Sequence, residues 1–437
     1  MSGRSVFRPI FRLFCRAFAE TRRGVACLFL VPALLSSAPH VQAAQINTPI
    51  VTSLTSTTEH MISYRHQEHS WQTSDGGMHV LINRGDQAGG DALALYSSHD
   101  AGLSWTLMAS LPKSGATSAA DGSFGSNTLT VTYSSSVGDV RATAFKYDPA
   151  LRAWSTTDVH KVPRASKQIA AFNPTQVTDR NKNGWIALVE SDLNSGESAI
   201  RLYRRAAGTQ VWEDTGLSFG PRDALSVYPA VKRSARLVLT PGGIGMIYTV
   251  REQMFWAERP TEGAADLPWT LRAEPLYTSP YPPDDEPLSS HFSTLVDDKG
   301  YLHTAMADGG RLIYQRYDAV ALAWGAPKVL TGDLNGTYPQ ITWIGGAKIA
   351  IVVNVDAMAR VFQSADRGQS GTFYCTHRLE HPVAPIGSGI DYGRPRIEMP
   401  SKSRAPVPVF QQFETQNGAK QRALLYQFDA AAAAACQ

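Results

Sequence analysis

The chain of 437 residues is poor in cysteine, carries little excess charge and lacks a long apolar run. Its composition, 43% hydrophobic and 18% charged, is that of a globular protein and excludes both a disordered chain and a bundle of membrane helices. Of its four cysteines, Cys15 and Cys27 lie in the N-terminal leader, which leaves Cys375 and Cys436 in the mature chain. These two could pair in an oxidising compartment, but the sequence does not show whether they are close in space.

The first 44 residues differ in character from the rest of the chain. Six arginines precede an apolar run from Val25 to Leu35, and Val41-Gln42-Ala43 supplies the small residues of a cleavage site. This pattern predicts a signal peptide over residues 1–44 and a mature protein that is secreted or periplasmic. A single membrane anchor is the alternative, but the apolar run is short for a membrane span. We therefore expect no membrane span after processing.

The positive charge of the full chain belongs largely to this leader. The first 44 residues contain six Arg and one Glu, so their removal changes the net charge from +3 to −2. A near-neutral mature chain offers no electrostatic attraction for nucleic acid, and we expect none as a partner.

A short motif gives the first indication of the fold. The stretch Ser98-His99-Asp100-Ala101-Gly102-Leu103-Ser104-Trp105 lies between two apolar, strand-like runs. Asp and Gly are typical of a tight turn between strands, so the pattern S-x-D-x-G-x-x-W predicts a hairpin. It resembles the Asp-box of sialidases and related BNR-repeat propellers.

The hairpin recurs along the chain in degenerate form. Successive copies end at an aromatic residue, and the steps between these residues are 49, 58, 57, 55 and 49 positions, at Trp105, Trp154, Trp212, Trp269, Trp324 and Phe373. Periods near 50 residues are typical of propeller blades, each of which buries its faces against its neighbours.

A second repeated pattern gives the number of blades. A polar or aromatic residue, often before Pro, opens an apolar strand seven times in the mature chain of 393 residues, or once per 56 residues. We therefore predict an all-β fold, a seven-bladed β-propeller of four-stranded antiparallel blades that spans residues 45–437 and ends in a short Ala-rich tail. The seventh unit lacks an outer strand, and we expect Thr48 to Leu54 to supply it and close the ring.

The strand openings and the loops between second and third strands converge at one end of a propeller axis. The openings bring His69, Tyr228, His291, Tyr338 and Arg394 to this end, and the loops bring Arg84, Asp86 and Arg251. Arginine binds a carboxylate through two parallel hydrogen bonds, while His and Tyr can exchange protons with a substrate. This set indicates chemistry on an acidic sugar, and β-elimination from a uronic acid is the reaction that it favours.

The seven-blade count, and segments such as His291 to His303, resemble BNR-repeat propellers that include ulvan lyases and related uronate-active enzymes. The resemblance implies His and Tyr as acid and base and Arg as the group that neutralises the carboxylate. These roles carry over to His69, His291, Tyr228 and Arg84. We expect four further residues to contact the acidic polysaccharide or glycan: Arg251, Tyr338, Arg394 and Asp86.

Two other functions remain open. In a sialidase-like exo-glycosidase, Arg84, Arg251 and Arg394 would form a carboxylate-binding cluster, but the Arg-Ile-Pro of sialidases is absent. A noncatalytic carbohydrate-binding propeller is the third possibility, because propellers support many functions. The differing openings favour a single asymmetric site over one repeated in each blade.

Neither a metal nor another cofactor is expected, and we expect a monomer. The segment His66-Gln67-Glu68-His69 has His and Glu close together but lacks the spacing of two His one helical turn apart, and it leads into a strand. His79 and His303 occupy matching positions inside second strands and are interpreted as structural.

Overall fold

A computed structural model describes most of the mature chain. The described residues are 49–62, 66–86, 91–157, 159–164, 166–224, 233–260, 268–281, 288, 291–331, 336–355, 358–384, 387–392, 396–415 and 420–429. All of them belong to one compact unit, residues 43–437. No helix among these residues is long and apolar enough to cross a membrane.

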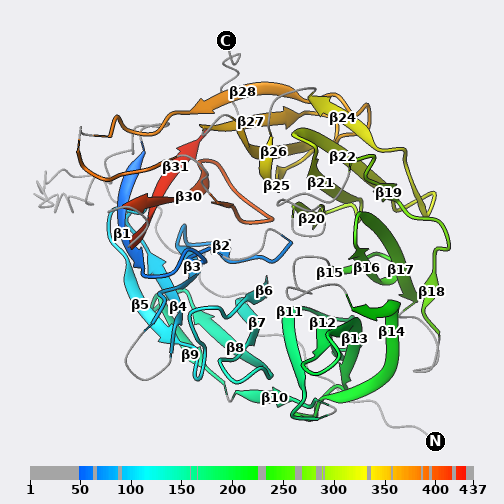
Figure 1. Cartoon of the computed structure of the whole chain (residues 1–437). Helices are drawn as coiled ribbons and strands as arrows, with labels where there is room; N and C mark the ends of the chain where they lie inside the picture. Colours follow the sequence, from blue (N-terminus) through cyan, green and yellow to red (C-terminus); the bar gives the residue numbers. More distant parts are fainter. Residues whose placement is uncertain are drawn as a thin grey trace, which may run out of the picture. The chain divides into compact units, whose positions relative to one another are not determined.

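Seven antiparallel sheets stand around a common axis and form a β-propeller, as predicted (Figure 1). Blade I consists of β2 (Ser70–Gln72), β3 (Met78–Asn83), β4 (Leu93–Ser98) and β5 (Thr106–Ser110), and blade II of β6 (Ala120–Gly125), β7 (Thr128–Ser134), β8 (Val140–Asp148), β9 (Ala153–Thr156) and β10 (His160–Val162). Blade III consists of β11 (Ile169–Thr178), β12 (Gly184–Asp192), β13 (Glu197–Arg205) and β14 (Glu213–Ala224). Blade IV consists of β15 (Arg233–Leu239), β16 (Gly243–Val250), β17 (Gln253–Pro260), β18 (Thr270–Leu271) and β19 (Tyr277–Thr278).

The remaining three blades complete the ring. They are V, β20 (Phe292–Val296), β21 (Leu302–Asp308), β22 (Arg311–Asp318), β23 (Ala323–Trp324) and β24 (Lys328–Thr331); VI, β25 (Thr337–Gly345), β26 (Lys348–Val355), β27 (Met358–Ser364) and β28 (Tyr374–Leu379); and VII, β29 (Ile397–Glu398), β30 (Val407–Thr415), β31 (Lys420–Phe428) and β1 (Ile50–Ser56). In blades II, IV and V the outer edge is shared by two short strands.

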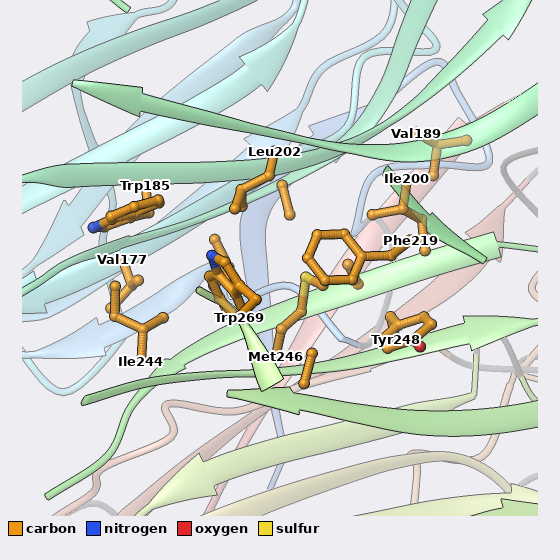
Figure 2. Close-up of a cluster of buried hydrophobic side chains, with 14 of the residues drawn as sticks. Val177, Trp185, Val189, Ile200, Leu202, Phe219, Ile244, Met246, Tyr248 and Trp269 are labelled. Carbon is orange, nitrogen blue, oxygen red and sulfur yellow. The ribbon is translucent and has the colours of Figure 1, made fainter. Parts of the chain in front are cut away.

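The core lies between the blades, because both faces of each sheet are covered by a neighbour. Strands β3 and β16 are buried at every position, and the polar residues His79 and Asn83 of β3 form hydrogen bonds in the interior. Figure 2 shows the core between blades III and IV, where Trp185, Phe219, Met246 and Trp269 pack together. The aromatic residues of the predicted repeat thus serve mainly as packing between sheets.

The motif hairpin forms the predicted turn. Asp100 accepts hydrogen bonds from the Ser98 hydroxyl at 2.8 Å and from the Ser104 backbone N–H at 2.9 Å, while Gly102 donates its N–H to the Ser98 oxygen at 2.9 Å. Gly102 has a φ of 88°, and a side chain there would meet Leu425 of blade VII. The turn therefore requires glycine for its backbone and for its packing.

Hydrogen bonds link the innermost strands around the axis. A side chain on one inner strand repeatedly accepts a hydrogen bond from a backbone N–H of the next inner strand. Asp121 accepts from Gln176 at 3.1 Å, Thr175 accepts from Leu237 at 3.2 Å, and Ser293 accepts from Ile341 at 3.3 Å. These bonds satisfy donors that would otherwise be buried without partners where the sheets meet. They explain why short polar residues interrupt the apolar inner strands.

The ring is closed by the N-terminal strand, as predicted. Strand β1 pairs with β31, with Ile50 opposite Leu425 and Ser56 opposite Gln421. Blade VII is thus built from both ends of the chain, and its inner three strands are β29, β30 and β31. Closure thus covers the outer edge of β31 with a fourth strand.

Cys375 on β28 is disulfide-bonded. Its bonding partner lies outside the described residues, as does Cys436. The pairing of these two cysteines stays a prediction.

Ring closure generates a stability prediction. Leu54 on β1 is 2% exposed and packs with Met78 and Leu425, whereas Val51 on the same strand is 45% exposed. We expect Leu54→Ala to lower the free energy of unfolding by about 2–5 kcal/mol, because it leaves a cavity at the closing seam. The control Val51→Ala should change it by less than about 0.5 kcal/mol. Chemical denaturation of both variants measures the difference, and equal effects would show that β1 adds little to the seam.

Candidate functional site

One chain segment enters the ring at the end where the inner strands begin. His66, just before blade I, stacks on Phe292 of blade V with ring centroids 5.4 Å apart. The next residue, Gln67, donates its side-chain N–H to the Pro174 oxygen of blade III at 2.9 Å. The segment thus reaches the far side of the ring and fills its centre. Its residues were singled out from the sequence, but nothing in the sequence indicates that they lie on the axis.

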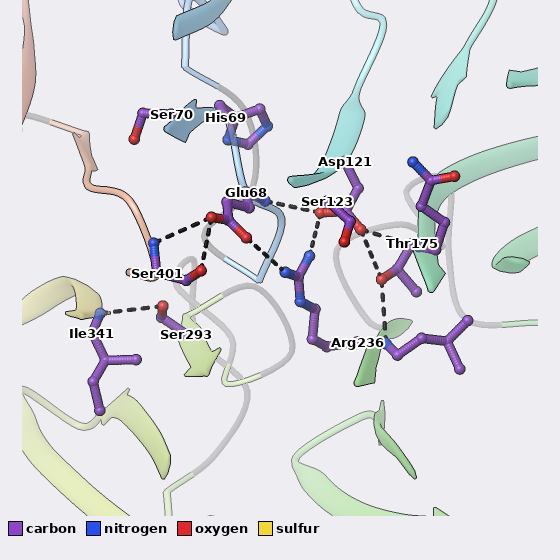
Figure 3. A network of polar contacts seen from close by, with 12 residues as sticks. Glu68, His69, Ser70, Asp121, Ser123, Thr175, Arg236, Ser293, Ile341 and Ser401 are labelled. Carbon is purple, nitrogen blue, oxygen red and sulfur yellow. Dashed lines mark hydrogen bonds and ion pairs between the residues drawn. The ribbon is translucent and has the colours of Figure 1, made fainter. Parts of the chain in front are cut away.

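Glu68, the third residue of this segment, is part of a buried charge network (Figure 3). The Arg236 guanidinium on β15 lies between Glu68 Oε2, at 3.4 Å, and Asp121 Oδ1 on β6, which it contacts directly. The other Glu68 oxygen accepts the Ser401 hydroxyl at 2.7 Å. Asp121 also accepts the Thr175 hydroxyl at 2.9 Å. Side chains from blades II, III and IV therefore meet the axial segment in one cluster.

The charges of this cluster shift each other's protonation. Burial raises the pKa of Glu68 from its ordinary 4.5 to about 7, although Arg236 acts in the opposite direction. Burial lowers the pKa of Arg236, but the adjacent Asp121 and Glu68 outweigh it and raise that pKa above its usual value. Glu68 is therefore a carboxyl group that exchanges its proton near neutral pH, within a site that holds a permanent positive charge.

The predicted catalytic residue His69 lies at the edge of this network. Its Nδ1 is 3.0 Å from Oε2 of Glu398 on β29, and the two side chains are 2% and 1% exposed. Its backbone N–H donates to Glu398 Oε1 at 3.1 Å. His69 thus ties blade I to blade VII from a buried position. A role in proton transfer for His69 stays a prediction.

Two other predicted residues are in contact. His291, before β20, and Tyr338, on β25, come from neighbouring blades, and their rings meet edge to face with centroids 5.2 Å apart. His291 is 4% exposed and Tyr338 9%. Tyr338 has a φ of 57° at a β-bulge before a proline, and Asn173 in blade III has a φ of 44° at a similar bulge. A residue before proline rarely adopts this conformation.

Arg84 and Asp86 follow β3 in blade I. The Arg84 guanidinium donates to the Asp91 oxygen at 2.6 Å and to the Ser110 hydroxyl at 3.1 Å, so it points along the loop toward the outer strand β5. Asp86 is exposed, and its N–H donates to Thr57 at 3.2 Å. The structure therefore places these two residues on the outer part of blade I, and their functional roles stay predictions.

Arg251 occupies the turn between β16 and β17 at the same end of the ring as the strand openings. It lines a cleft of about 660 Å³ together with Tyr248, Gln253, Phe255 and Arg272. Tyr228 and Arg394, which are also predicted site residues, lie outside the described residues. Within the described part of the chain, no three His, Cys, Asp or Glu side chains converge as a metal site requires.

Sequence reasoning missed Asp121, Arg236 and Glu398. Each is a buried charged residue that lies between small or apolar residues in an inner strand, as in Ala235-Arg236-Leu237. That contrast was the available signal, because a charge in a buried strand requires a partner. Its partner was not predictable, since Arg236 and Glu68 lie on different blades.

The seven sheets around the axial cluster form a seven-bladed propeller, the architecture that the sequence resemblance predicted. No family model matches the sequence, and no curated protein matches it. Solved structures share the fold. An ulvan lyase, described as bound to -[GlcA(1-4)Rha3S]-, aligns over 86% of this chain and 95% of its own with a TM-score of 0.51 and 10% identity.

Two further structures are similar over most of this chain. The polysaccharide lyase Uly1 aligns over 84% of this chain and 91% of its own, with a TM-score of 0.47 and 11% identity. A lectin of Aleuria aurantia, in complex with Fucalpha1-6GlcNAc, aligns over 74% and 98%, with a TM-score of 0.43 and 14% identity. At these identities the similarity establishes the propeller fold alone.

The Glu68 cluster generates a pH prediction. Because the folded state holds the Glu68 proton up to about pH 7 and the unfolded state loses it near 4.5, stability contributed by this group falls as pH rises across that window. The full difference is about 3 kcal/mol. Glu68→Gln cannot titrate, so the unfolding free energy of this variant should lose that decline. Denaturation of both proteins between about pH 4 and about pH 8 measures this pH dependence of the unfolding free energy. Parallel pH profiles would contradict the assignment of the raised pKa to Glu68.

Proposed function

We propose that this protein is a secreted or periplasmic enzyme that cleaves an acidic polysaccharide by β-elimination, with His291 and Tyr338 as its acid–base pair. The observation that carries the proposal is their contact, with ring centroids 5.2 Å apart, across the junction of blades V and VI. An imidazole and a phenol from separate blades form the pair of proton carriers that such a reaction uses.

The reaction makes two demands on this pair. One member removes the proton from the sugar carbon beside the carboxylate, and the other gives a proton to the glycosidic oxygen as the bond to that oxygen breaks. The electron pair of the C–H bond becomes the new carbon–carbon double bond, so the products are an unsaturated uronate and a free hydroxyl. No water and no cofactor is consumed.

The local structure of Tyr338 supports a functional role. Its φ of 57° before a proline is a strained conformation for a non-glycine residue. Strain of this kind persists where surrounding packing holds it, and Tyr338 is 9% exposed against His291. The strained bulge turns the phenol toward the imidazole, which gives a reason for a residue other than glycine at this position.

The acidity of the substrate rests on arginine. Arg251 lies at the same end of the ring as the pair, and in the sequence Arg394 stands three residues before Ile397, where β29 begins. A guanidinium neutralises the carboxylate and so favours loss of the neighbouring proton. We propose Arg394 as the group that neutralises this carboxylate, whereas Arg251 contacts another residue of the polysaccharide.

A noncatalytic carbohydrate-binding protein is the second candidate. The cleft at Arg251, with aromatic and guanidinium groups in about 660 Å³, favours it because such a cleft binds a sugar without any proton transfer. A sialidase-like hydrolase is the third, and its products distinguish it from a lyase.

A single hydroxyl group tests the acid–base pair. We expect the mature protein to release unsaturated uronates, detected by their ultraviolet absorbance, from at least one polysaccharide of a uronate panel. Tyr338→Phe should lower kcat by about 100-fold or more, because it removes one proton carrier. The control is Tyr314→Phe, which removes a hydroxyl bonded to His303 at 2.7 Å elsewhere in blade V and should retain cleavage.

Other products would point to the other candidates. Reducing ends or free sialic acid without a rise in absorbance would replace elimination with hydrolysis. Sugar binding without any product would favour the noncatalytic protein. Equal activity of the Tyr338→Phe and Tyr314→Phe variants would remove Tyr338 from the mechanism.

Export generates a separate prediction. The ring begins with β1 at Ile50, so cleavage after residue 44 would leave the closing strand intact. We expect the protein recovered from the periplasm or medium to lack residues 1–44, which N-terminal sequencing and intact mass measure. An uncleaved N-terminus in the exported protein would instead favour a membrane anchor.

A further inference from the structure

The cleft at Arg251 lies between the outer parts of blades III and IV. Gly220 on β14 forms one wall, the hairpin of β16 and β17 another, and Leu271 with Arg272 the outer side. Its volume of about 660 Å³ is in the range of small-ligand sites, about 300–1,000 Å³. None of the residues that line it belongs to the His291–Tyr338 pair, so it is a separate place on the same end of the ring.

The floor of the cleft is aromatic and rigid. Tyr248 and Phe255 stack with ring centroids 5.3 Å apart and an interplanar angle of 18°. Phe219 packs against Tyr248 from the interior, at 5.7 Å (Figure 2). Tyr248 is 4% exposed, whereas Phe255 is partly exposed. The electron-rich face of an aromatic ring attracts the weakly positive C–H groups that line one side of a sugar ring.

The rim of the cleft is positive. Arg251 and Arg272 are both exposed, and the neutral side chain of Gln253 also lines the cleft. No Asp or Glu is among the described residues that line the cleft. Two guanidinium groups above an aromatic floor match a ring-shaped ligand that carries a carboxylate or a sulfate.

The backbone at Arg251 fixes where its guanidinium is presented at the cleft. Arg251 and Glu252 form a two-residue turn between Val250 and Gln253, and Arg251 has a φ of 55°. Glycine is the low-strain residue at such a position. The corresponding turn of blade V is Gly309-Gly310. Blade IV therefore keeps a guanidinium where the backbone alone favours glycine.

We propose that this cleft is a binding site for an anionic sugar residue, carboxylated or sulfated, which stacks on Phe255 and pairs with Arg251 and Arg272. The site holds a polysaccharide by a residue remote from the His291–Tyr338 pair. Its existence does not depend on cleavage, because it rests on the cleft alone.

The chain offers a matched control for the test. Arg152 is also exposed with a φ of 51°, but it lies in the hairpin between β8 and β9 at the opposite end of the ring. Arg251→Gly and Arg152→Gly thus remove the same charge and relieve the same backbone strain. Each should leave stability equal to or above that of the parent, so loss of fold does not confuse the result.

The experiment is affinity electrophoresis through gels that contain polygalacturonate, dextran sulfate or neutral dextran. All variants are made with Tyr338→Phe, so that cleavage does not consume the probe. We expect retardation of the parent by one or both anionic probes, and polygalacturonate against dextran sulfate distinguishes a carboxylate from a sulfate ligand. Arg251→Gly should weaken this binding about tenfold, because it removes a charge-assisted pair. Arg272→Gln should also weaken the binding. Arg152→Gly should bind as the parent does.

Three results would overturn the proposal: no retardation by either anionic probe, equal retardation by neutral dextran, or equal loss of binding in Arg251→Gly and Arg152→Gly. The last would indicate attraction to the net charge of the protein instead of a site. Failure of the elimination reaction is recorded separately, by the absence of unsaturated products, and leaves the binding result as it stands.

Discussion

Burial of the Arg236 guanidinium on the axis is the constraint around which the centre of this propeller is arranged. A charge removed from water costs several kcal/mol unless other groups replace its hydration. Here Asp121 and Glu68 do so, and these carboxylates in turn accept bonds from Thr175 and Ser401. The need of one buried guanidinium for polar partners thus sets the positions of side chains on several blades and fixes the path of the axial segment.

In the proposed mechanism, that arrangement also separates structural from chemical roles. His69 is held by Glu398 inside the ring, while the contact between His291 and Tyr338 is made at another junction of the same end. A propeller can accommodate this division because it has many inner strands, and only some of them are needed to hold the axial segment in place. The asymmetry of the strand openings is the sequence counterpart of the division.

The fold was predictable from the sequence because each blade repeats the same physical requirements. Turn residues at Asp100 and Gly102, apolar strands and a missing seventh outer strand predicted the architecture, including an N-terminal strand that completes the last blade. The site was predictable only by position along each blade. Neither the contact of His291 with Tyr338 nor the partner of Arg236 was predictable, because strand period does not show which side chains face one another across blades.

Strand β1 has a consequence for how the molecule is made. Ile50 pairs with Leu425, so β1 gains its partner strand only after most of the chain has been synthesised. Contacts of such long sequence separation slow folding. During that interval the unpaired edge of β1 is open to pairing with other chains, which makes the incomplete chain prone to aggregation.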